Sequence, residues 1–336
     1  MLEPLPVTRV ELELTEACNQ RCLFCYNSCQ PATCDHPETL FESLAEAGVF
    51  ELILTGGEPS LHPRFFDVLR YATTLFPRVM VQSNGVNFAD PVFFAQLSSY
   101  PIFCLNFSLH GPEAIHDKIT GTSGGFRKTV TALTAAVKAG IRTASNLVLT
   151  ALNAAPASLL ATVEILGEAG VREMTVTRFI PCGLGKSALE LSTTPQVFSR
   201  AVDVLREATA KKGISLLLAT ATPSCRLPEH QRDLCNRCSF GFDKFYVDVR
   251  GDVLTCGMAR IPLGNLFRTP LHDLLAASDV YRDFRGLNHL PHRCRQCAEL
   301  SECGGGCRAA ALASGGEVTA DDPFCCTDEP ITRIAI

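Results

Sequence analysis

The chain has 336 residues, 46% apolar and 19% charged, so it is long enough for two domains and apolar enough for a buried core. Its net charge is −5, from 30 basic and 35 acidic residues, and it has no long basic run, which argues against a nucleic-acid-binding protein. The sequence has no N-terminal signal peptide and no apolar run of membrane-spanning length, which predicts a cytoplasmic protein that does not bind a membrane.

The first two thirds of the sequence alternate between apolar strands and amphipathic helices. Strands are expected at residues 9–15, 51–54, 78–82, 102–109, 142–150 and 173–180, and helices at residues 38–47, 64–75, 91–97, 127–139, 157–169 and 195–211. This alternation predicts an α/β fold with a parallel sheet covered by helices. Six such units make a partial barrel, open on one side, whose ligand site lies at the carboxyl ends of the strands.

The alternation stops after Leu218, and the rest of the chain is rich in loops and cysteines. We therefore predict a partial (β/α)6 barrel over residues 1–215 and a small cysteine-rich domain over residues 216–336. Such a domain buries little apolar surface by itself. We expect it to depend on bound metal for its stability.

Seventeen cysteines are present, and in a reducing compartment short cysteine spacings indicate metal sites rather than disulfides. Cys18, Cys22 and Cys25 follow the first strand with the spacing C-x3-C-x2-C. Soft thiolates favour zinc or iron–sulfur clusters, and a structural zinc site normally takes four ligands. An iron–sulfur cubane held by three thiolates instead leaves one iron open. A zinc loop completed by Cys29 or Cys34 is the alternative.

This loop, with Phe24 before its third cysteine, resembles the CX3CXφC signature of the radical SAM superfamily. The resemblance implies that Cys18, Cys22 and Cys25 hold a [4Fe-4S] cluster whose open iron binds S-adenosylmethionine (SAM). Reductive cleavage of SAM would release a 5′-deoxyadenosyl radical that abstracts a hydrogen atom from the substrate. An electron donor of the flavodoxin or ferredoxin type would supply the electron.

The resemblance also implies SAM contacts at the ends of later strands. Glu58 lies in a motif like the family's GGEP, whose glycines let the backbone approach the ligand and whose carboxylate receives the SAM ammonium group. Asn84 is the candidate for the ribose and Ser108 for the carboxylate of SAM. His110 stands where many relatives have Asp, and Arg178 is a second candidate for the carboxylate, although a structural role is equally open for these two. The complete set of expected contacts is Phe24, Gly56, Gly57, Glu58, Asn84, Ser108, His110 and Arg178.

The C-terminal cysteines resemble the SPASM extension of radical SAM enzymes, CX9–15GX4C…CX2CX5CX3C…C, and every spacing fits. In that family the extension carries two auxiliary [4Fe-4S] clusters with interleaved ligands, and two four-cysteine zinc sites are the alternative. The resemblance implies a first auxiliary cluster held by Cys238, Cys256 and Cys307, and a second held by Cys294, Cys297, Cys303 and either Cys325 or Cys326. Cys235, which forms a CxxC with Cys238, is the candidate for the fourth ligand of the first cluster. The spare cysteines are Cys29, Cys34, Cys104, Cys182 and Cys225, with Cys182 a candidate to face the substrate.

SPASM proteins most often modify ribosomally made peptides, so we expect a peptide maturase that forms a crosslink, epimerises or oxidises its substrate. Because the cluster motif begins at Cys18, a leader peptide is expected to bind a separate recognition protein or the barrel itself. Gly257 follows Cys256 where sulfatase maturases have an Asp base, which weighs against that activity. The alternatives are modification of a small-molecule or tetrapyrrole precursor and, in a different class, a zinc-rich scaffold or electron-transfer module.

Overall fold

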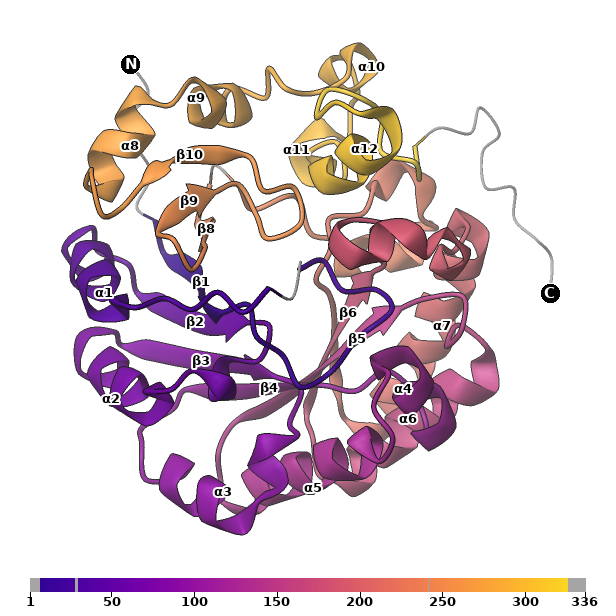
Figure 1. Cartoon of the computed structure of the whole chain (residues 1–336). Coiled ribbons are helices and arrows are strands. Elements are labelled where there is room, and N and C mark those ends of the chain that lie inside the picture. Colours follow the sequence, from indigo (N-terminus) through magenta and orange to yellow (C-terminus); the bar gives the residue numbers. More distant parts are fainter. Residues whose placement is uncertain (1–6, 28–29, 241, 326–336) are drawn as a thin grey trace.

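The computed structural model describes residues 7–27, 30–240 and 242–325, and its central element is one ten-stranded sheet (Figure 1). Along the sheet the strands follow the order β10-β9-β8-β1-β2-β3-β4-β5-β6-β7. The strands are β1 (Arg9–Thr15), β2 (Glu51–Gly56), β3 (Arg78–Ser83), β4 (Cys104–Ser108), β5 (Thr143–Leu149), β6 (Glu173–Arg178), β7 (Ser215–Leu218), β8 (Lys244–Val247), β9 (Asp252–Leu254) and β10 (Pro262–Asn265). Strands β1 to β7 are parallel to their neighbours, and this confirms the predicted barrel-type sheet.

Helices between residues 37 and 212 pack around the barrel strands, and the helices after residue 270 lie in the C-terminal region (Figure 1). They are α1 (Pro37–Glu46), α2 (Phe65–Leu75), α3 (Pro91–Leu97), α4 (Glu113–Thr120), α5 (Gly125–Lys138), α6 (Pro156–Glu168), α7 (Pro195–Lys212), α8 (Leu271–Ala277), α9 (Asp279–Arg285), α10 (His292–Arg295), α11 (Leu300–Cys303) and α12 (Arg308–Gly315). Helix α4, which follows β4, was not predicted from the sequence. It matters for function because it holds the first cysteine loop.

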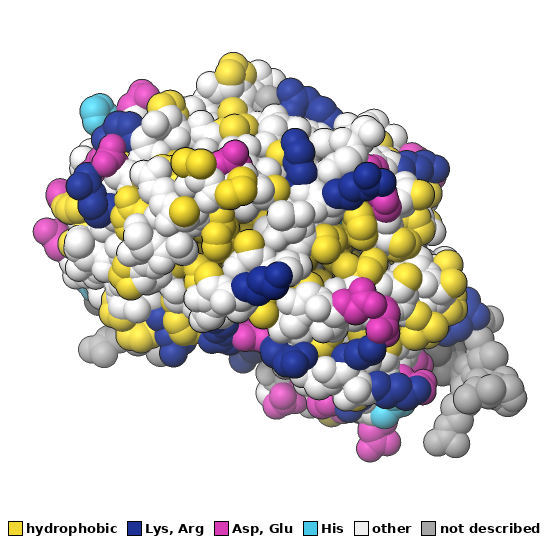
Figure 2. Space-filling view, turned by 90° about the horizontal axis from the view of Figure 1, so that it is seen from below, with side chains coloured by type: hydrophobic (Ala, Val, Ile, Leu, Met, Phe, Trp, Pro, Cys, Tyr) yellow, Lys and Arg dark blue, Asp and Glu magenta, His cyan; other side chains and the backbone are white. Residues whose placement is uncertain are grey.

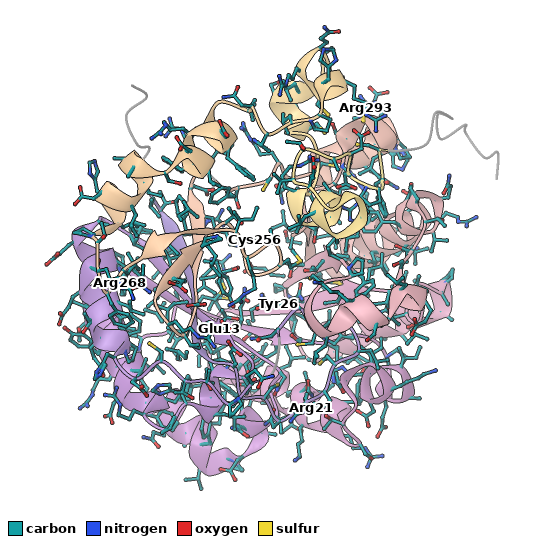
Figure 3. All side chains as sticks on the ribbon, turned by 45° about the horizontal axis from the view of Figure 1, so that its top comes forward. Glu13, Arg21, Tyr26, Cys256, Arg268 and Arg293 are labelled. Carbon is teal, nitrogen blue, oxygen red and sulfur yellow. The ribbon has the colours of Figure 1, made fainter. Side chains whose placement is uncertain are left out.

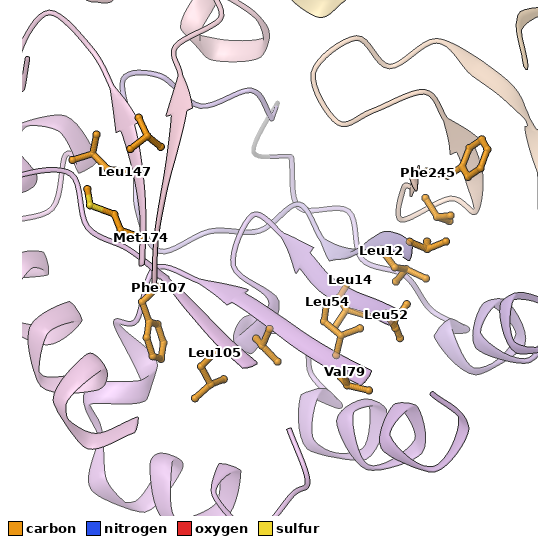
Figure 4. Packing of buried hydrophobic residues seen from close by; sticks show 14 of the residues in the cluster. Leu12, Leu14, Leu52, Leu54, Val79, Leu105, Phe107, Leu147, Met174 and Phe245 are labelled. Atoms are coloured by element: carbon orange, nitrogen blue, oxygen red, sulfur yellow. The ribbon is translucent and has the colours of Figure 1, made fainter. Parts of the chain in front are cut away.

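Alternate residues of each strand point toward the helices and form the core (Figure 4). Leu12 and Leu14 of β1 lie beside Leu52 and Leu54 of β2, and all four are completely buried. The residues between them, such as Glu13, face the other side of the sheet. The apolar face therefore fixes the register that turns polar side chains into the barrel.

The C-terminal region shares this core and buries its apolar residues against the barrel. The β8 strand runs parallel to β1, with Val10 opposite Phe245 and Leu12 opposite Val247. Phe240 of the C-terminal region meets Phe284 of α9 edge to face, with ring centroids 4.5 Å apart. Strands β8 to β10 were not predicted from the sequence, because short strands in a loop-rich segment carry little periodicity of their own.

The predicted boundary between residues 215 and 216 falls inside β7, a strand that pairs with β6. The division into two domains at this point therefore stays a prediction. None of the helices in the described part of the chain could cross a membrane. Figure 2 shows basic and acidic side chains interspersed with apolar ones on the face that it draws.

Removal of the metal should affect only part of the C-terminal region. Among the described residues, none between 286 and 323 belongs to the main apolar core, whereas several between 240 and 284 do. Limited proteolysis of the metal-free protein, followed by mass spectrometry, should therefore give first cuts within residues 286–325. A first cut near residue 219 would show that the C-terminal region depends on metal as a whole.

Candidate active site

The first cysteine loop leaves the carboxyl end of β1 and is held by backbone hydrogen bonds. Arg21 and Leu23 donate their N–H groups to carbonyls at the end of α4, at 3.0 and 2.9 Å. Gly185, in the short 3-10 helix η3 (Gly183–Ser187) that follows β6, donates to the Cys25 carbonyl at 3.0 Å. Elements far apart in the sequence thus position the three predicted cluster ligands.

The thiols of this loop have surroundings that fit a metal cluster. Cys18, Cys22 and Cys25 are all partly exposed. The Gln20 N–H donates to Cys18 Sγ at 3.4 Å, and Asn84 Nδ2 donates to the same sulfur at 3.8 Å. Hydrogen bonds directed at sulfur stabilise the thiolate form that binds iron. The donor set is therefore compatible with the predicted [4Fe-4S] cluster.

The GGEP turn after β2 needs glycine for close contact with this loop. Gly57 donates to the Thr15 carbonyl at 2.7 Å, and Glu58 donates its N–H to the Ala17 carbonyl at 2.8 Å. A Cβ atom at residue 57 would collide with the backbone oxygens of Glu16 and Ala17. Gly57 therefore allows the GGEP turn to pack closely against the chain that leads from β1 into the first cysteine loop.

Glu58 is completely buried, and its carboxylate is surrounded by donors of this chain. Ser60 donates its N–H and hydroxyl at 3.1 and 2.6 Å, and the Ser83 hydroxyl donates at 2.9 Å. The Asn84 N–H donates to the second oxygen at 2.8 Å. Burial raises the pKa of Glu58, and these hydrogen bonds oppose that rise. Glu58 therefore ties the end of β2 to the end of β3, and its contact with the SAM ammonium group stays a prediction.

Asn84 and Ser108 lie at neighbouring strand ends, as predicted. The Asn84 side chain donates to Asn19 Oδ1 at 2.7 Å and so contacts the first cysteine loop directly. Ser108 ends β4 and is partly exposed, opposite Asn146 of β5. Their proposed contacts with the ribose and carboxylate of SAM are not tested by this geometry.

His110 is buried and neutral rather than a cation for a carboxylate. Burial, with His116 as a second cause, lowers its pKa well below the usual value. Its Nδ1 accepts the Val148 N–H at 3.2 Å, and its ring meets the edge of Phe24 at 4.7 Å between centroids. His110 thus links β4, β5 and the aromatic residue of the cysteine motif.

Arg178 pairs with a carboxylate of its own chain. Its two terminal nitrogens donate to Asp322 at 3.0 and 2.7 Å, and both side chains are buried. The guanidinium of Arg178 is therefore already occupied, and a contact with SAM finds no support in this arrangement.

Three predicted ligands of the first auxiliary cluster line one cavity of about 110 Å³. These are Cys238, Cys256 and Cys307, and Thr220, Ala221 and Tyr246 complete the nearby wall. Burial raises the pKa of Cys238 to about 11 and that of Cys256 to about 12, so these thiols must lose protons when metal binds. Thiols that line one cavity are compatible with a multi-iron cluster.

The fourth ligand of this site is less well defined. Cys235 lies near Cys303, with its Sγ directed at the Gln231 carbonyl at 3.8 Å. Cys182, which follows β6, packs with Cys307 in a small apolar cluster bordered by Cys238 and Cys256. Cys235 and Cys182 are therefore both candidates for the fourth ligand of this cluster. The sequence analysis had named Cys182 as a candidate to face the substrate.

The second set of cysteines includes one residue that the sequence left as spare. Cys225 lies close to Cys303, Cys325 and Cys297. Cys294 is close to Cys303. Cys225 could not be assigned from the sequence, because it lies outside the motif. The predicted alternative ligand Cys326 lies outside the described residues. Within the described residues no three His, Cys, Asp or Glu side chains are close enough to hold one metal ion.

A buried polar network lies between the two cysteine sites (Figure 3). Asn27 donates to Glu13, and Arg260 Nη1 lies 3.6 Å from the other Glu13 oxygen. Burial raises the pKa of Glu13 to about 7. Figure 3 shows Glu13, Tyr26 and Cys256 close together near the centre of the molecule, where the first cysteine loop meets the C-terminal region. The sequence analysis did not single out Glu13 or Arg260.

Gly257 has no room for a side chain at this point. A Cβ atom there would lie 2.9 Å from the ring of Tyr246 and 3.1 Å from that of Tyr26. An Asp after Cys256 would therefore not fit unless these rings moved.

Comparison with known proteins identifies the domains that carry these sites. Residues 12–153 match the radical SAM superfamily, and residues 235–298 match the SPASM iron–sulfur cluster-binding domain. The chain is a radical SAM enzyme with a C-terminal SPASM domain. The SPASM match supports iron–sulfur clusters over zinc for the C-terminal cysteines.

Several characterised radical SAM enzymes are similar to it over most of its length. The AdoMet-dependent heme synthase of Methanosarcina barkeri is 27% identical over 335 residues, covering 93% of this chain and 94% of the relative. The PqqA peptide cyclase of Ruegeria pomeroyi is 28% identical, covering 97% and 88%. The sporulation killing factor maturation protein SkfB of Bacillus subtilis is 28% identical, covering 80% and 65%.

Solved structures of such enzymes share the fold. Streptococcus suis SuiB bound to S-adenosylmethionine superimposes with a TM-score of 0.76 at 17% identity, covering 96% of this chain and 78% of SuiB. The anSMEcpe enzyme with bound AdoMet gives a TM-score of 0.72 at 18% identity, covering 95% and 94%. At these identities the similarity establishes the partial barrel with its C-terminal extension.

Replacing Glu58 by Gln should destabilise the protein. The amide would turn a donor toward the Asn84 N–H, which would lose its buried acceptor at a cost of about 1–3 kcal/mol. Denaturant unfolding of the two proteins measures this difference. Glu46→Gln, which makes the same change at an exposed carboxylate, is the control and should leave the stability unchanged. Equal stability of Glu58→Gln and the wild type would contradict the assigned role.

The raised pKa of Glu13 predicts a pH-dependent stability. Because the folded protein binds the Glu13 proton more tightly than the unfolded chain, protonation of Glu13 stabilises the fold. This contribution to the free energy of unfolding is fully present below pH 4.5 and is lost as the pH rises through about 7. Gln cannot lose a proton, so the free energy of unfolding of Glu13→Gln, relative to that of the wild type, should rise by up to about 3 kcal/mol between pH 4.5 and pH 8. Urea unfolding at both pH values measures the gain, with exposed Glu46→Gln as control. A difference that does not change with pH would contradict the shift.

Proposed function

We propose that this enzyme uses SAM and three [4Fe-4S] clusters to modify a ribosomally made peptide by crosslinking, epimerisation or oxidation. The observation that carries the proposal is the cavity lined by Cys238, Cys256 and Cys307 beside the first cysteine loop. Tyr26 of that loop packs against the apolar cluster that contains Cys307. A substrate in the barrel would then lie between a radical source and an auxiliary cluster.

The residues at the carboxyl edge have separable tasks in this proposal. Cys18, Cys22 and Cys25 would hold the SAM-binding cluster, which with SAM supplies a 5′-deoxyadenosyl radical for hydrogen abstraction. Glu58 holds the Asn84 backbone in place, and Asn84 in turn contacts Asn19 in the cluster loop. Neutral His110 and Phe24 form an apolar wall that keeps water from the radical.

The proposed substrate class is inferred from the similar proteins. Peptide cyclase and peptide-maturation proteins resemble this chain along most of its length, which supports a peptide substrate. SuiB has been solved bound to its precursor peptide SuiA. We further propose a flavodoxin- or ferredoxin-type donor, a cytoplasmic location and, for a peptide with a leader, a separate recognition protein.

Modification of a tetrapyrrole precursor is the second candidate. The heme synthase of Methanosarcina barkeri matches 93% of this chain and is itself covered to 94%, so the two proteins share nearly their whole length. The peptide cyclase of Ruegeria pomeroyi is covered to 88%. The heme synthase thus supports a tetrapyrrole precursor, whereas the peptide cyclases and the killing factor maturation protein support a peptide.

The cofactor proposal predicts the metal content. Anaerobically reconstituted protein should hold about 12 irons per chain in three clusters and show the visible absorbance of iron–sulfur charge transfer. Replacing Cys18, Cys22 and Cys25 together by Ala should remove about four irons and abolish 5′-deoxyadenosine formation, and the auxiliary clusters should remain. An unchanged iron content, or stoichiometric zinc, would refute the assignment.

The substrate proposal is tested by offering both classes. The reduced enzyme with SAM should be incubated with short peptides encoded beside its gene and, separately, with tetrapyrrole carboxylates. Mass spectrometry then follows product formation together with 5′-deoxyadenosine. A mass change in a peptide, coupled to 5′-deoxyadenosine, supports the proposal. A mass change only in the tetrapyrrole would contradict the peptide proposal and support the second candidate, modification of a tetrapyrrole precursor.

A further inference from the structure

Arg178 and Asp322 form a buried ion pair that joins the barrel to the end of the C-terminal region. The two residues lie 144 positions apart, and their side chains are 2% and 0% exposed. A buried pair is expensive to desolvate and is a weak source of stability by itself. The pair lies next to two of the predicted cluster ligands, which suggests a role in the cluster sites in addition to stability.

Asp322 holds the backbone at one predicted ligand of each auxiliary cluster. Its Oδ2 accepts the Cys307 N–H at 2.7 Å, and its carbonyl accepts the Cys325 N–H at 2.6 Å. Its Oδ1 also accepts the Phe324 N–H at 2.9 Å. One residue thus orients both cysteines, and Arg178 holds that residue against the barrel.

The surroundings leave this arrangement little freedom. The Arg178 guanidinium lies over the Phe324 ring, 4.0 Å from its centroid, and Phe324 meets Phe198 of α7 at 5.5 Å. A Cβ atom at Gly306 would lie 2.8 Å from Asp322 Oδ2, so only glycine fits before Cys307. The guanidinium also lies close enough to Cys307 for its charge to act on the thiol.

We propose that Arg178 is the positioning residue of the auxiliary clusters: through Asp322 it fixes Cys307 and Cys325, and its charge tunes the cluster that Cys307 binds. A cation and N–H donors beside a ligand sulfur stabilise the reduced, more negative state of an iron–sulfur cluster. Arg178 therefore raises the reduction potential of the first auxiliary cluster. The inference rests on the auxiliary clusters of the proposed function.

The test compares Arg178→Met and Arg178→Lys in the full-length, reconstituted protein. Arg206 and Asp233 offer a matched control, because they pair through the same two-bond geometry at 2.6 and 2.9 Å but are exposed, so Arg206→Met is made in parallel. Iron per chain and EPR-monitored redox titration are the readouts. The EPR response to SAM reports separately on the cluster at Cys18, Cys22 and Cys25.

Arg178→Met should either lose about four irons or keep them with the potential of one auxiliary cluster shifted to a more negative value. Its response to SAM should stay normal, Arg178→Lys should fall between Met and wild type, and Arg206→Met should match wild type. If Arg178→Met is insoluble, Asp322→Asn is measured instead. It should either lose about four irons or keep them with the potential of one auxiliary cluster shifted to a less negative value, because no carboxylate then opposes the Arg178 cation.

Wild-type iron content and potentials in Arg178→Met, or in Asp322→Asn where that variant replaces it, would overturn the inference. A wild-type protein that holds a single cluster would instead refute the proposed cofactors, and this result is visible before any variant is made.

Discussion

The parallel pairing of β1 with β8 is the constraint on which the rest of the structure depends. The two strands are in register from Arg9 opposite Lys244 to Leu12 opposite Val247. Since they run in the same direction, the segments that follow them leave the same edge of the sheet. The segment that follows β1 carries Cys18, Cys22 and Cys25. The segment that follows β8 turns back as the antiparallel strand β9, and Cys256 comes after β9, where Gly257 lies close to the rings of Tyr246 and Tyr26. The pairing of β1 with β8 and the β8–β9 hairpin therefore together bring Cys256 beside the first cysteine loop.

The contact between these two segments is filled with buried polar groups. Glu13 from β1 receives a hydrogen bond from Asn27 and lies close to Arg260, and Arg260 also donates to Asp248 at 3.2 Å. Charges in such a place are costly unless they are paired. The same side of the barrel holds the cavity of the first auxiliary site. The polar network thus aligns the walls of the space in which a substrate would sit.

Much of the barrel was predictable from the sequence, because each strand and helix carries its own periodicity. The motif at Cys18, Cys22 and Cys25 was predictable as well, since its ligands lie within eight residues. Helix α4 was missed because it is short and polar. The pairing of β8 with β1 was not predictable, because no local pattern links segments more than 200 residues apart.

The hydrogen-bond and ion-pair partners of individual polar residues could not be predicted from the sequence either. Arg178 looked like a ligand for a carboxylate, and its partner proved to be Asp322 of the same chain. Glu58 carries a family-like motif, yet the structure first shows its bonds to Ser60, Ser83 and Asn84. Residue type indicated the chemistry in both cases, while only the folded chain shows which donor meets which acceptor.

The central claim is that a radical-generating cluster and an auxiliary cluster face the same space at the carboxyl edge of the barrel. The most direct measurement is an anomalous difference map at the iron edge from a crystal of the anaerobic, reconstituted protein. The account predicts iron at Cys18, Cys22 and Cys25, iron in the cavity of Cys238, Cys256 and Cys307, and a third site near Cys303. A map without iron in that cavity, or with one zinc ion in place of a cluster, would contradict it.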